Sequence, residues 1–167
     1  MNASLTKLDE LKQHFPCNGK VEWIGIRPSK GSAIVEKSCV NAVSDYGLEG
    51  DKAGQRAGGK RQVTLIQAEY IQVVHSLLPE MDISFADMRR NIAISGINLN
   101  ALKNCKIQLG QAILEISGFC HPCSKLEARL GHGVFNAMRG HGGLTAKVIQ
   151  DGKIKLGDQL RVLSIQS

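Results

Sequence analysis

Apolar residues recur at helical spacing at the start of the chain and at strand-like spacing through most of the rest. The first pattern predicts a short amphipathic helix that is capped near Ser4 and ends at Pro16. Its apolar positions are Leu5, Leu8, Leu11 and Phe15. We therefore expect residues 1–18 to form a helical extension and residues 19–167 to form a single domain.

Short apolar or alternating segments predict many β-strands after that extension. The predicted strands are residues 19–26, 33–35, 40–43, 62–66, 90–95, 112–116, 144–149 and 159–164. Val21 and Trp23 are expected to point inward from the first strand, and Asp151-Gly152 has the composition of a hairpin turn. The predicted helices are short: residues 68–78, 124–130 and 134–138. Such a pattern predicts a mainly β fold, a closed or nearly closed barrel with a few short helices.

The charge of the chain narrows the choice of ligand. The formal net charge is +6, and a basic surface favours polyanions such as nucleic acid. However, aromatic residues, which stack on bases in single-strand binders, make up only 4% of the chain. The lysines and arginines are also scattered rather than gathered in a run. A small anionic ligand, such as a phosphate-bearing cofactor, is therefore favoured over nucleic acid.

The cysteine count and the hydropathy pattern indicate the compartment. The 167 residues include five cysteines, an odd number in a chain long enough to build its own core, which argues against a disulfide framework. No segment approaches the roughly 18 apolar residues that span a bilayer. Charged residues interrupt the first 16 positions, so no signal peptide is predicted. We expect a cytoplasmic protein with no membrane partner.

The sharpest local motif is Cys120-His121-Pro122-Cys123, between a predicted strand and a predicted helix. A cysteine just before a helix lies near backbone N–H groups that favour a thiolate, the form that attacks and binds soft metals. A zinc site needs four ligands, and the spacing of His132 and His141 is not diagnostic. A thioredoxin-like pair would need a βαβ context. We favour a core position for Cys120 and a chemical role for Cys123.

Two further motifs are suited to anions. Arg89-Arg90-Asn91 enters a predicted strand, and adjacent guanidinium groups can form fork-shaped contacts with phosphate. Gly140-His141-Gly142-Gly143 could bring backbone N–H groups close to an anion. Taken alone, the first motif is better explained as a solvated charged turn. The second is explained equally well as a flexible connection.

The motifs form part of an ordered set of blocks that spans roughly residues 19–164. The blocks are Gly47–Asp51, Arg61–Ile66 with Glu69, Arg89–Ile92 with Gly96, Gly110, Cys120–Cys123 with Lys125 and Leu126, Gly140–Gly143, and Gly152–Asp158. In this order and spacing they resemble the MOSC domain. That domain is the C-terminal module of molybdenum cofactor sulfurase and also occurs as stand-alone bacterial proteins.

The resemblance implies a β-barrel-like fold and a site for the molybdenum cofactor (molybdopterin). By position in its block, Cys123 matches the cysteine that ligates molybdenum in relatives that reduce N-hydroxylated compounds. Arg89 and Asn91 match the block that lies near the cofactor. We expect Arg89, Arg90 and either Lys30 or Lys52 to hold the pterin phosphate. The loop with Gly140, Gly142 and Gly143 is expected to close against the cofactor.

The function implied by the resemblance is the reduction of a small N-hydroxylated substrate, such as a hydroxylamino-purine. The chain shows no flavin, nicotinamide or iron–sulfur motif, so a separate electron-donor protein is expected. Two other functions stay open. The chain could be a sulfur carrier with a persulfide on Cys123 or Cys120, or a non-catalytic module that binds the cofactor. We do not expect nucleic acid as a partner.

Overall fold

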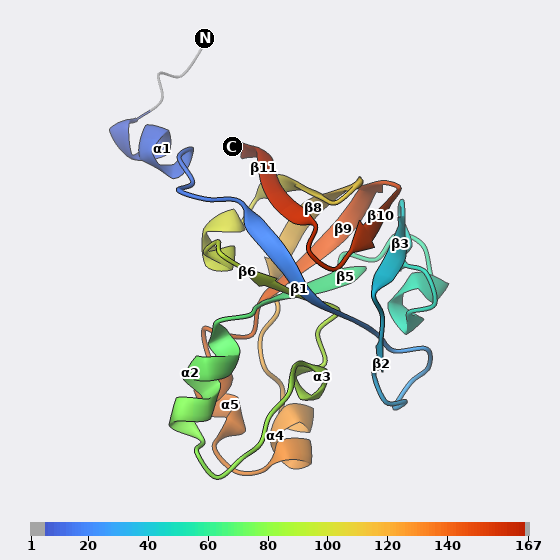
Figure 1. Ribbon diagram of the computed structural model, residues 1–167, viewed down its shortest axis with the longest axis vertical. Helices are drawn as coiled ribbons and strands as arrows, with labels where there is room; N and C mark the ends of the chain where they lie inside the picture. Colours follow the sequence, from blue (N-terminus) through green and yellow to red (C-terminus); the bar gives the residue numbers. More distant parts are fainter. Residues whose placement is uncertain (1–5, 166–167) are drawn as a thin grey trace.

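Seven strands close into a β-barrel in the computed structural model, which describes residues 6–165 (Figure 1). Around the barrel the order is β1, β11, β7, β8, β9, β5 and β6, and β6 returns to β1. Their bounds are β1 Gly19–Ile26, β5 Val63–Gln67, β6 Ile92–Ser95, β7 Cys105–Leu109, β8 Ala112–Phe119, β9 Leu144–Gln150 and β11 Gln159–Ile165. Neighbours are antiparallel, except that β5 and β6 are parallel. The predicted barrel is confirmed.

Alternating side chains fill the barrel. On β7, Cys105, Ile107 and Leu109 are fully buried, and the residues between them are half-buried. This is the period-2 pattern of a strand with one face in the core. No strand was predicted at β7, although Lys106 and Gln108 alternate with its buried apolar residues as this period requires. Closure depends on a short contact, since β1 pairs with β11 only at Gly19 and Lys20.

A second, smaller sheet packs beside the barrel. It contains β3 (Cys39–Val43), β4 (Gly47–Leu48) and β10 (Gly152–Lys155), while β2 (Val35–Glu36) pairs with the end of β1. The predicted hairpin at Asp151-Gly152 is wrong, because β9 pairs with β5 and β8, whereas β10 pairs with β3. The Asp151 carboxylate instead accepts a hydrogen bond from the backbone N–H of Ser44 at 2.5 Å.

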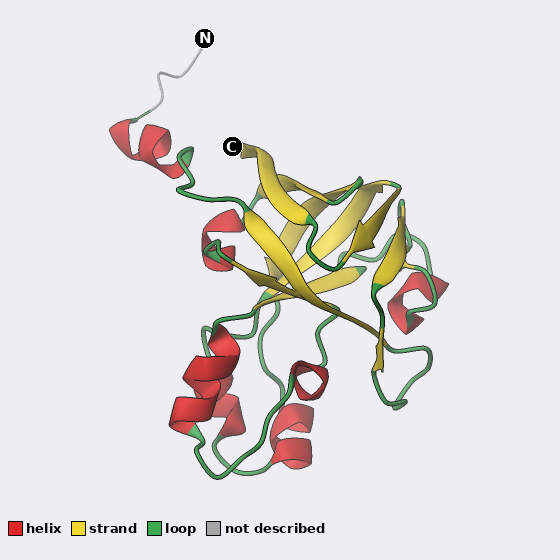
Figure 2. Cartoon of the chain, viewed as in Figure 1, coloured by secondary structure: helices red, strands yellow, loops and turns green. Residues whose placement is uncertain are grey.

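Short helices gather at one end of the barrel (Figure 2). They are α2 (Tyr70–Leu77), α3 (Phe85–Met88), α4 (Ser124–Leu130) and α5 (Val134–Met138). Two 3-10 helices, η1 (Lys52–Gln55) and η2 (Leu99–Leu102), lie in other connections. The helices cover a second core that includes Val74, Met88 and Leu126. Within residues 6–165, none of the helices has both the length and the apolar character needed to cross a membrane.

Trp23 belongs to this second core rather than to the barrel interior. The pairing of β1 with β6 shifts register between Val21 and Trp23, so the two side chains are buried in different cores. Val21 points inward as predicted. Trp23 is buried, but it lies beneath the helices, where its ring packs against that of Phe85 with centroids 6.0 Å apart. The helices α3 and α4 pack on this second core.

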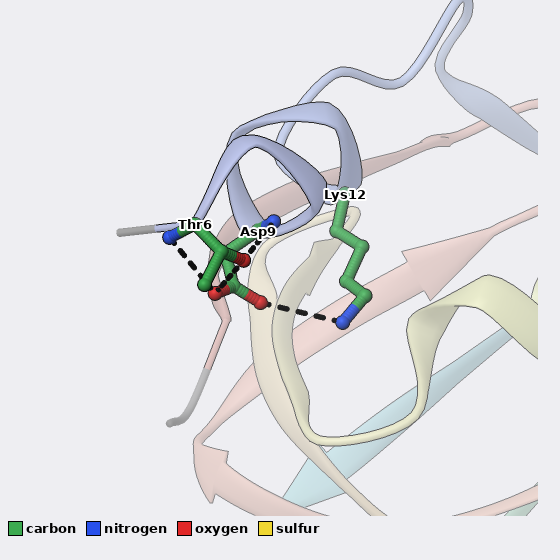
Figure 3. Close-up of polar contacts among 3 residues, drawn as sticks. All are labelled: Thr6, Asp9 and Lys12. Atoms are coloured by element: carbon green, nitrogen blue, oxygen red, sulfur yellow. Dashed lines mark hydrogen bonds and ion pairs between the residues drawn. The ribbon is translucent and has the colours of Figure 1, made fainter. Parts of the chain in front are cut away.

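The N-terminal helix α1 (Lys7–Lys12) projects away from the barrel (Figure 1). Its N-cap is Thr6, whose hydroxyl accepts the backbone N–H of Asp9 while the Asp9 carboxylate accepts the backbone N–H of Thr6 (Figure 3). The predicted cap, Ser4, lies outside the described residues. No residue of α1 is buried, so capping rather than packing defines this helix.

Candidate functional site

One pocket, of about 700 Å³, lies where the loop after β1 faces α3 and α4. We call it the basic pocket because five arginines and three lysines line it: Arg27, Lys30, Lys52, Arg61, Arg89, Arg90, Lys125 and Arg129. Cys123, Leu126 and residues 31–33 complete its lining. No acidic side chain is among these lining residues. Such a wall favours an anionic ligand.

The loop that carries Arg27 is tied to the barrel by a buried carboxylate. Asp51 is 3% exposed, and its Oδ1 accepts the backbone N–H of Arg27 at 2.7 Å. Its Oδ2 accepts the backbone N–H of Ala53 at 2.9 Å and caps η1. The backbone N–H of Lys52 in turn donates to the carbonyl oxygen of Arg27 at 2.7 Å. Both basic residues are therefore fixed at the pocket wall by backbone contacts.

Asn91 lies beneath the pocket and not on its wall. Its Oδ1 accepts hydrogen bonds from the backbone N–H and the hydroxyl of Thr64, at 3.0 and 2.9 Å. Its Nδ2 donates to the carbonyl oxygen of Gly25 and to Asp51, at 3.2 and 3.1 Å. All side-chain polar groups of Asn91 are thus used within the protein. Its role here is to join β1, β5 and β6 under the site, and its contact with a cofactor stays a prediction.

Arg89 takes an unusual backbone conformation at the end of α3. Its φ is 55°, in the left-handed region that non-glycine residues seldom adopt. Burial lowers the pKa of the Arg89 guanidinium, and the positive charges of Arg27 and Arg129 lower it further. The guanidinium still stays protonated, because its intrinsic pKa is so high. Three like charges therefore lie close together on this side of the pocket.

Arg90 is buried, and it both lines the basic pocket and bonds to neighbouring segments of the chain. It is 6% exposed, and its guanidinium donates to three carbonyl oxygens: Gly142 at 2.8 Å, Met88 at 2.8 Å and Cys120 at 3.4 Å. The pKa of Arg90 is lowered, first by burial and also by the positive charge of Arg61. The sulfurs of Cys120 and Cys123 act in the opposite direction and raise this pKa. Arg90 thereby connects the strand entrance, the cysteine motif and the glycine loop.

The two cysteines of the Cys-X-X-Cys motif have different surroundings. Cys123 is exposed, lines the basic pocket and is the N-cap residue of α4. Cys120 is 1% exposed, and its Sγ accepts a hydrogen bond from Arg61 Nη2 at 3.1 Å. The core position favoured for Cys120 is confirmed. Cys123 is the thiol within reach of a ligand in the pocket.

The glycine loop supports the cysteine motif from behind. A Cβ on Gly142 would overlap the carbonyl oxygen of Cys120, and a Cβ on Gly143 would overlap the carbonyl oxygen of Leu65. The backbone N–H of Cys120 donates to the carbonyl oxygen of Gly143 at 2.8 Å. Gly140 lies apart, and its carbonyl oxygen accepts Nδ2 of Asn100 at 3.3 Å. None of the three glycines lines the basic pocket, so closure of this loop on a cofactor stays a prediction.

The structure thus brings five of the predicted site residues into one pocket: Lys30, Lys52, Arg89, Arg90 and Cys123. Sequence analysis gave no site role to Arg27, Arg61 or Arg129. For Arg129 a signal existed, because it follows Lys125 by four residues on one helix and so shares its face. Within residues 6–165, no group of three or more His, Cys, Asp or Glu side chains is placed to hold a metal ion, which leaves the zinc interpretation without a ligand set.

Comparison with known proteins decides the family. The sequence model of the MOSC domain matches residues 51–161, a stretch that runs from the buried Asp51 through the cysteine motif into β11. The chain belongs to the MOSC domain family. A search of curated proteins gave no match.

Several solved structures have the same fold as this chain. The YuaD protein from Bacillus subtilis superposes with a TM-score of 0.77 at 19% identity, over 92% of this chain and 100% of YuaD. YiiM from Escherichia coli gives 0.70 at 21% identity, over 91% of this chain and 72% of YiiM. YiiM from Geobacillus stearothermophilus gives 0.66 at 15% identity, over 87% and 75%. At 15–21% identity, this likeness shows a shared fold and nothing more.

Proposed function

We propose that this MOSC protein binds a molybdenum cofactor in the basic pocket and reduces N-hydroxylated substrates such as hydroxylamino-purines. The observation that carries the proposal is the exposed thiol of Cys123 in a pocket lined by eight basic side chains and by no acidic one. A thiolate suits a soft metal, and guanidinium groups suit the phosphate of a pterin cofactor. The donor set in the pocket therefore fits both ends of such a group.

Each residue has a defined part in this proposal. Cys123 would ligate the metal, and Arg89 would hold the cofactor phosphate together with Lys30 or Lys52. Arg90 would hold the cysteine motif in place through its bond to the Cys120 carbonyl oxygen. When bound, the cofactor would supply the redox chemistry, and the protein would supply binding and orientation.

The overall reaction balances as the reduction of an N–O bond. An N-hydroxylated substrate takes up two electrons and two protons, the N–O bond breaks, and an amine and one water are formed. The electrons would come from a separate donor protein, because the chain carries no flavin, nicotinamide or iron–sulfur motif. Cys123 is exposed and lines the basic pocket, so its thiol is accessible to a small-molecule substrate.

Analysis of freshly purified protein tests the proposal against its two alternatives. Stoichiometric molybdenum together with turnover of a hydroxylamino-purine, given a chemical electron donor, is the expected result. Molybdenum without turnover would indicate a non-catalytic binding module. Cyanide-releasable sulfur without molybdenum would indicate a sulfur carrier with a persulfide on Cys123. Protein that takes up neither molybdenum nor sulfur, even after incubation with isolated cofactor, would contradict all three.

A further inference from the structure

The basic pocket holds more positive charge than one cofactor phosphate can balance. A phosphate monoester carries about two negative charges near neutral pH, whereas eight basic side chains line the pocket. Among the described residues, one ion pair involves these side chains, between Arg129 Nη2 and Asp87 Oδ1 at 3.6 Å. The excess charge calls for a second anionic group in the same pocket.

The basic residues divide into two groups by what they already bond. Arg90 donates to three carbonyl oxygens, and Arg61 donates to the sulfur of Cys120. By contrast, Nε of Arg27 is buried and has no hydrogen-bond partner among the described residues. A buried donor without a partner is costly, so Arg27 is a guanidinium whose hydrogen-bonding capacity the described residues do not fully meet. Arg27 and Arg129 both lie close enough to Arg89 to perturb its charge.

We propose that Arg27 and Arg129 form a second anion subsite that binds the phosphate of a nucleotide substrate. This inference rests on the proposed function and deepens it: the substrate class is an N-hydroxylated nucleoside phosphate rather than a free base. An uncharged base offers two guanidinium groups no acceptor of opposite charge. A phosphate ester offers several oxygens in the geometry that guanidinium groups bind best. A pocket of about 700 Å³ lies within the range of roughly 300–1,000 Å³ that is usual for small-molecule sites.

Calorimetric titration of the purified full-length protein with AMP, adenosine and inorganic phosphate tests the subsite. AMP should bind roughly tenfold or more tightly than adenosine, because charge-assisted hydrogen bonds add to the contacts of the base. It should also bind more tightly than inorganic phosphate, which lacks the nucleoside. Equal affinity for AMP and adenosine would overturn the subsite. Phosphate binding as tightly as AMP would overturn the nucleotide assignment.

Matched variants separate the subsite from the general charge of the protein. Arg27→Gln and Arg129→Gln should each reduce AMP affinity roughly tenfold and leave adenosine unchanged. Arg161→Gln makes the same charge change on β11, outside the basic pocket, and should leave AMP affinity unchanged. An equal loss in Arg161→Gln would reduce the effect to net charge and overturn the proposal. Circular dichroism of each variant confirms that it is folded.

Asp87→Asn distinguishes direct contact from a positioning role for Arg129. If Arg129 contacts the phosphate, loss of its ion-pair partner should leave AMP affinity unchanged or raise it. If Arg129 instead holds α3 and α4 together, Asp87→Asn should weaken AMP binding as much as Arg129→Gln does, which would overturn the assignment. Arg129→Lys keeps a positive charge and should recover part of the lost affinity.

The two proposals can fail separately, and the measurements distinguish which of them has failed. AMP selectivity in protein that never takes up molybdenum would keep the subsite and remove the reductase. Molybdenum-loaded protein that reduces the free base but shows no preference for AMP would keep the reductase and overturn the subsite.

Discussion

Two pockets on this protein are rich in basic residues, yet they differ in how those residues are paired. The basic pocket has no acidic side chain in its lining, and Nε of Arg27 lacks a partner among the described residues. The second pocket, of about 370 Å³, we call the β10–β11 pocket. It is lined by Gln108, Gly110, Gln111, Lys153, Lys155, Asp158, Gln159 and Arg161. There Arg161 donates two bonds to the Gln159 side chain, and Asp158 accepts the backbone N–H of Lys155.

The comparison shows that the number of positive charges does not by itself mark a site. In the β10–β11 pocket, neighbouring polar groups use one another's hydrogen-bonding capacity, and no thiol is present. In the basic pocket, one exposed cysteine lies among eight basic side chains with no acidic residue in the lining, and Arg27 keeps an unpartnered Nε, so an anionic ligand can supply what the lining does not. Five predictions test this contrast, in order of decreasing effect.

Cys123→Ser should abolish molybdenum retention and substrate turnover while the fold survives. Serine has nearly the same size, but its hydroxyl is a far poorer ligand for a soft metal. Metal analysis and thermal melting measure the two consequences separately. Cys39→Ser, at an exposed position on β3 outside the basic pocket, is the matched control and should change neither.

Cys120→Ser should reduce molybdenum retention less than Cys123→Ser does. Cys120 is buried, and its sulfur already accepts a bond from Arg61. Full retention of molybdenum by Cys123→Ser would refute the ligand assignment. An equal loss of turnover at both cysteines, with both variants folded, would point instead to a dithiol mechanism.

Asn91→Ala should lower the free energy of unfolding by about 3 kcal/mol. It removes four side-chain hydrogen bonds beneath the basic pocket and leaves buried partners such as the Thr64 N–H unpaired. Gln108→Ala, in the β10–β11 pocket, removes one side-chain bond to the carbonyl oxygen of Gly110 and should cost below about 1 kcal/mol. Urea denaturation measures the free energy of unfolding of both variants. Similar losses would show that the hydrogen bonds beneath the basic pocket contribute no more to stability than the bond in the β10–β11 pocket.

Arg89→Gly should weaken cofactor retention roughly tenfold without loss of stability. The side chain that would bind phosphate is removed at a cost on the order of 1.5–3 kcal/mol of binding. Glycine also accepts the left-handed backbone at this position. Arg89→Ala should bind equally weakly but melt at a lower temperature than the glycine variant, because alanine, like arginine, carries a Cβ that is strained in this backbone. Arg89→Lys should recover part of the affinity. Unchanged retention in the glycine variant would make Arg89 a structural residue.

Oligonucleotides should bind weakly and without sequence preference at physiological salt, the smallest effect of the five. The 21 lysines and arginines are dispersed among 15 acidic residues, and few aromatic side chains could stack on bases. Fluorescence anisotropy at two salt concentrations measures this binding and its salt dependence. Submicromolar, sequence-preferring binding would instead assign the basic pocket to nucleic acid.

The sequence predicted the barrel because local patterns report which face of a strand is buried. It failed where partners are distant in the chain: β10 leaves β9 to pair with β3, and no local signal at Asp151 distinguishes this from a hairpin. The site shows the same division. Cys123 was found from its place before a helix, whereas Arg27 joins it only because Asp51 ties the loop after β1 to η1.

Asn91 shows what the sequence leaves open. The family resemblance placed it near the cofactor, and in the structure its side chain bonds Thr64 and Asp51, so its contact with a cofactor stays a prediction. Sequence gives the order of residues along a strand entrance, and the direction of each side chain depends on which strands lie on either side. The family match shows the fold, but it does not show in which direction each side chain points.

Anomalous diffraction at the molybdenum absorption edge, from crystals of cofactor-loaded protein, tests the central claim most directly. We expect a single peak in the basic pocket, next to the sulfur of Cys123, and no peak in crystals of Cys123→Ser prepared in the same way. A peak elsewhere, or one that persists in the variant, would show that the basic pocket around Cys123 is not the metal site.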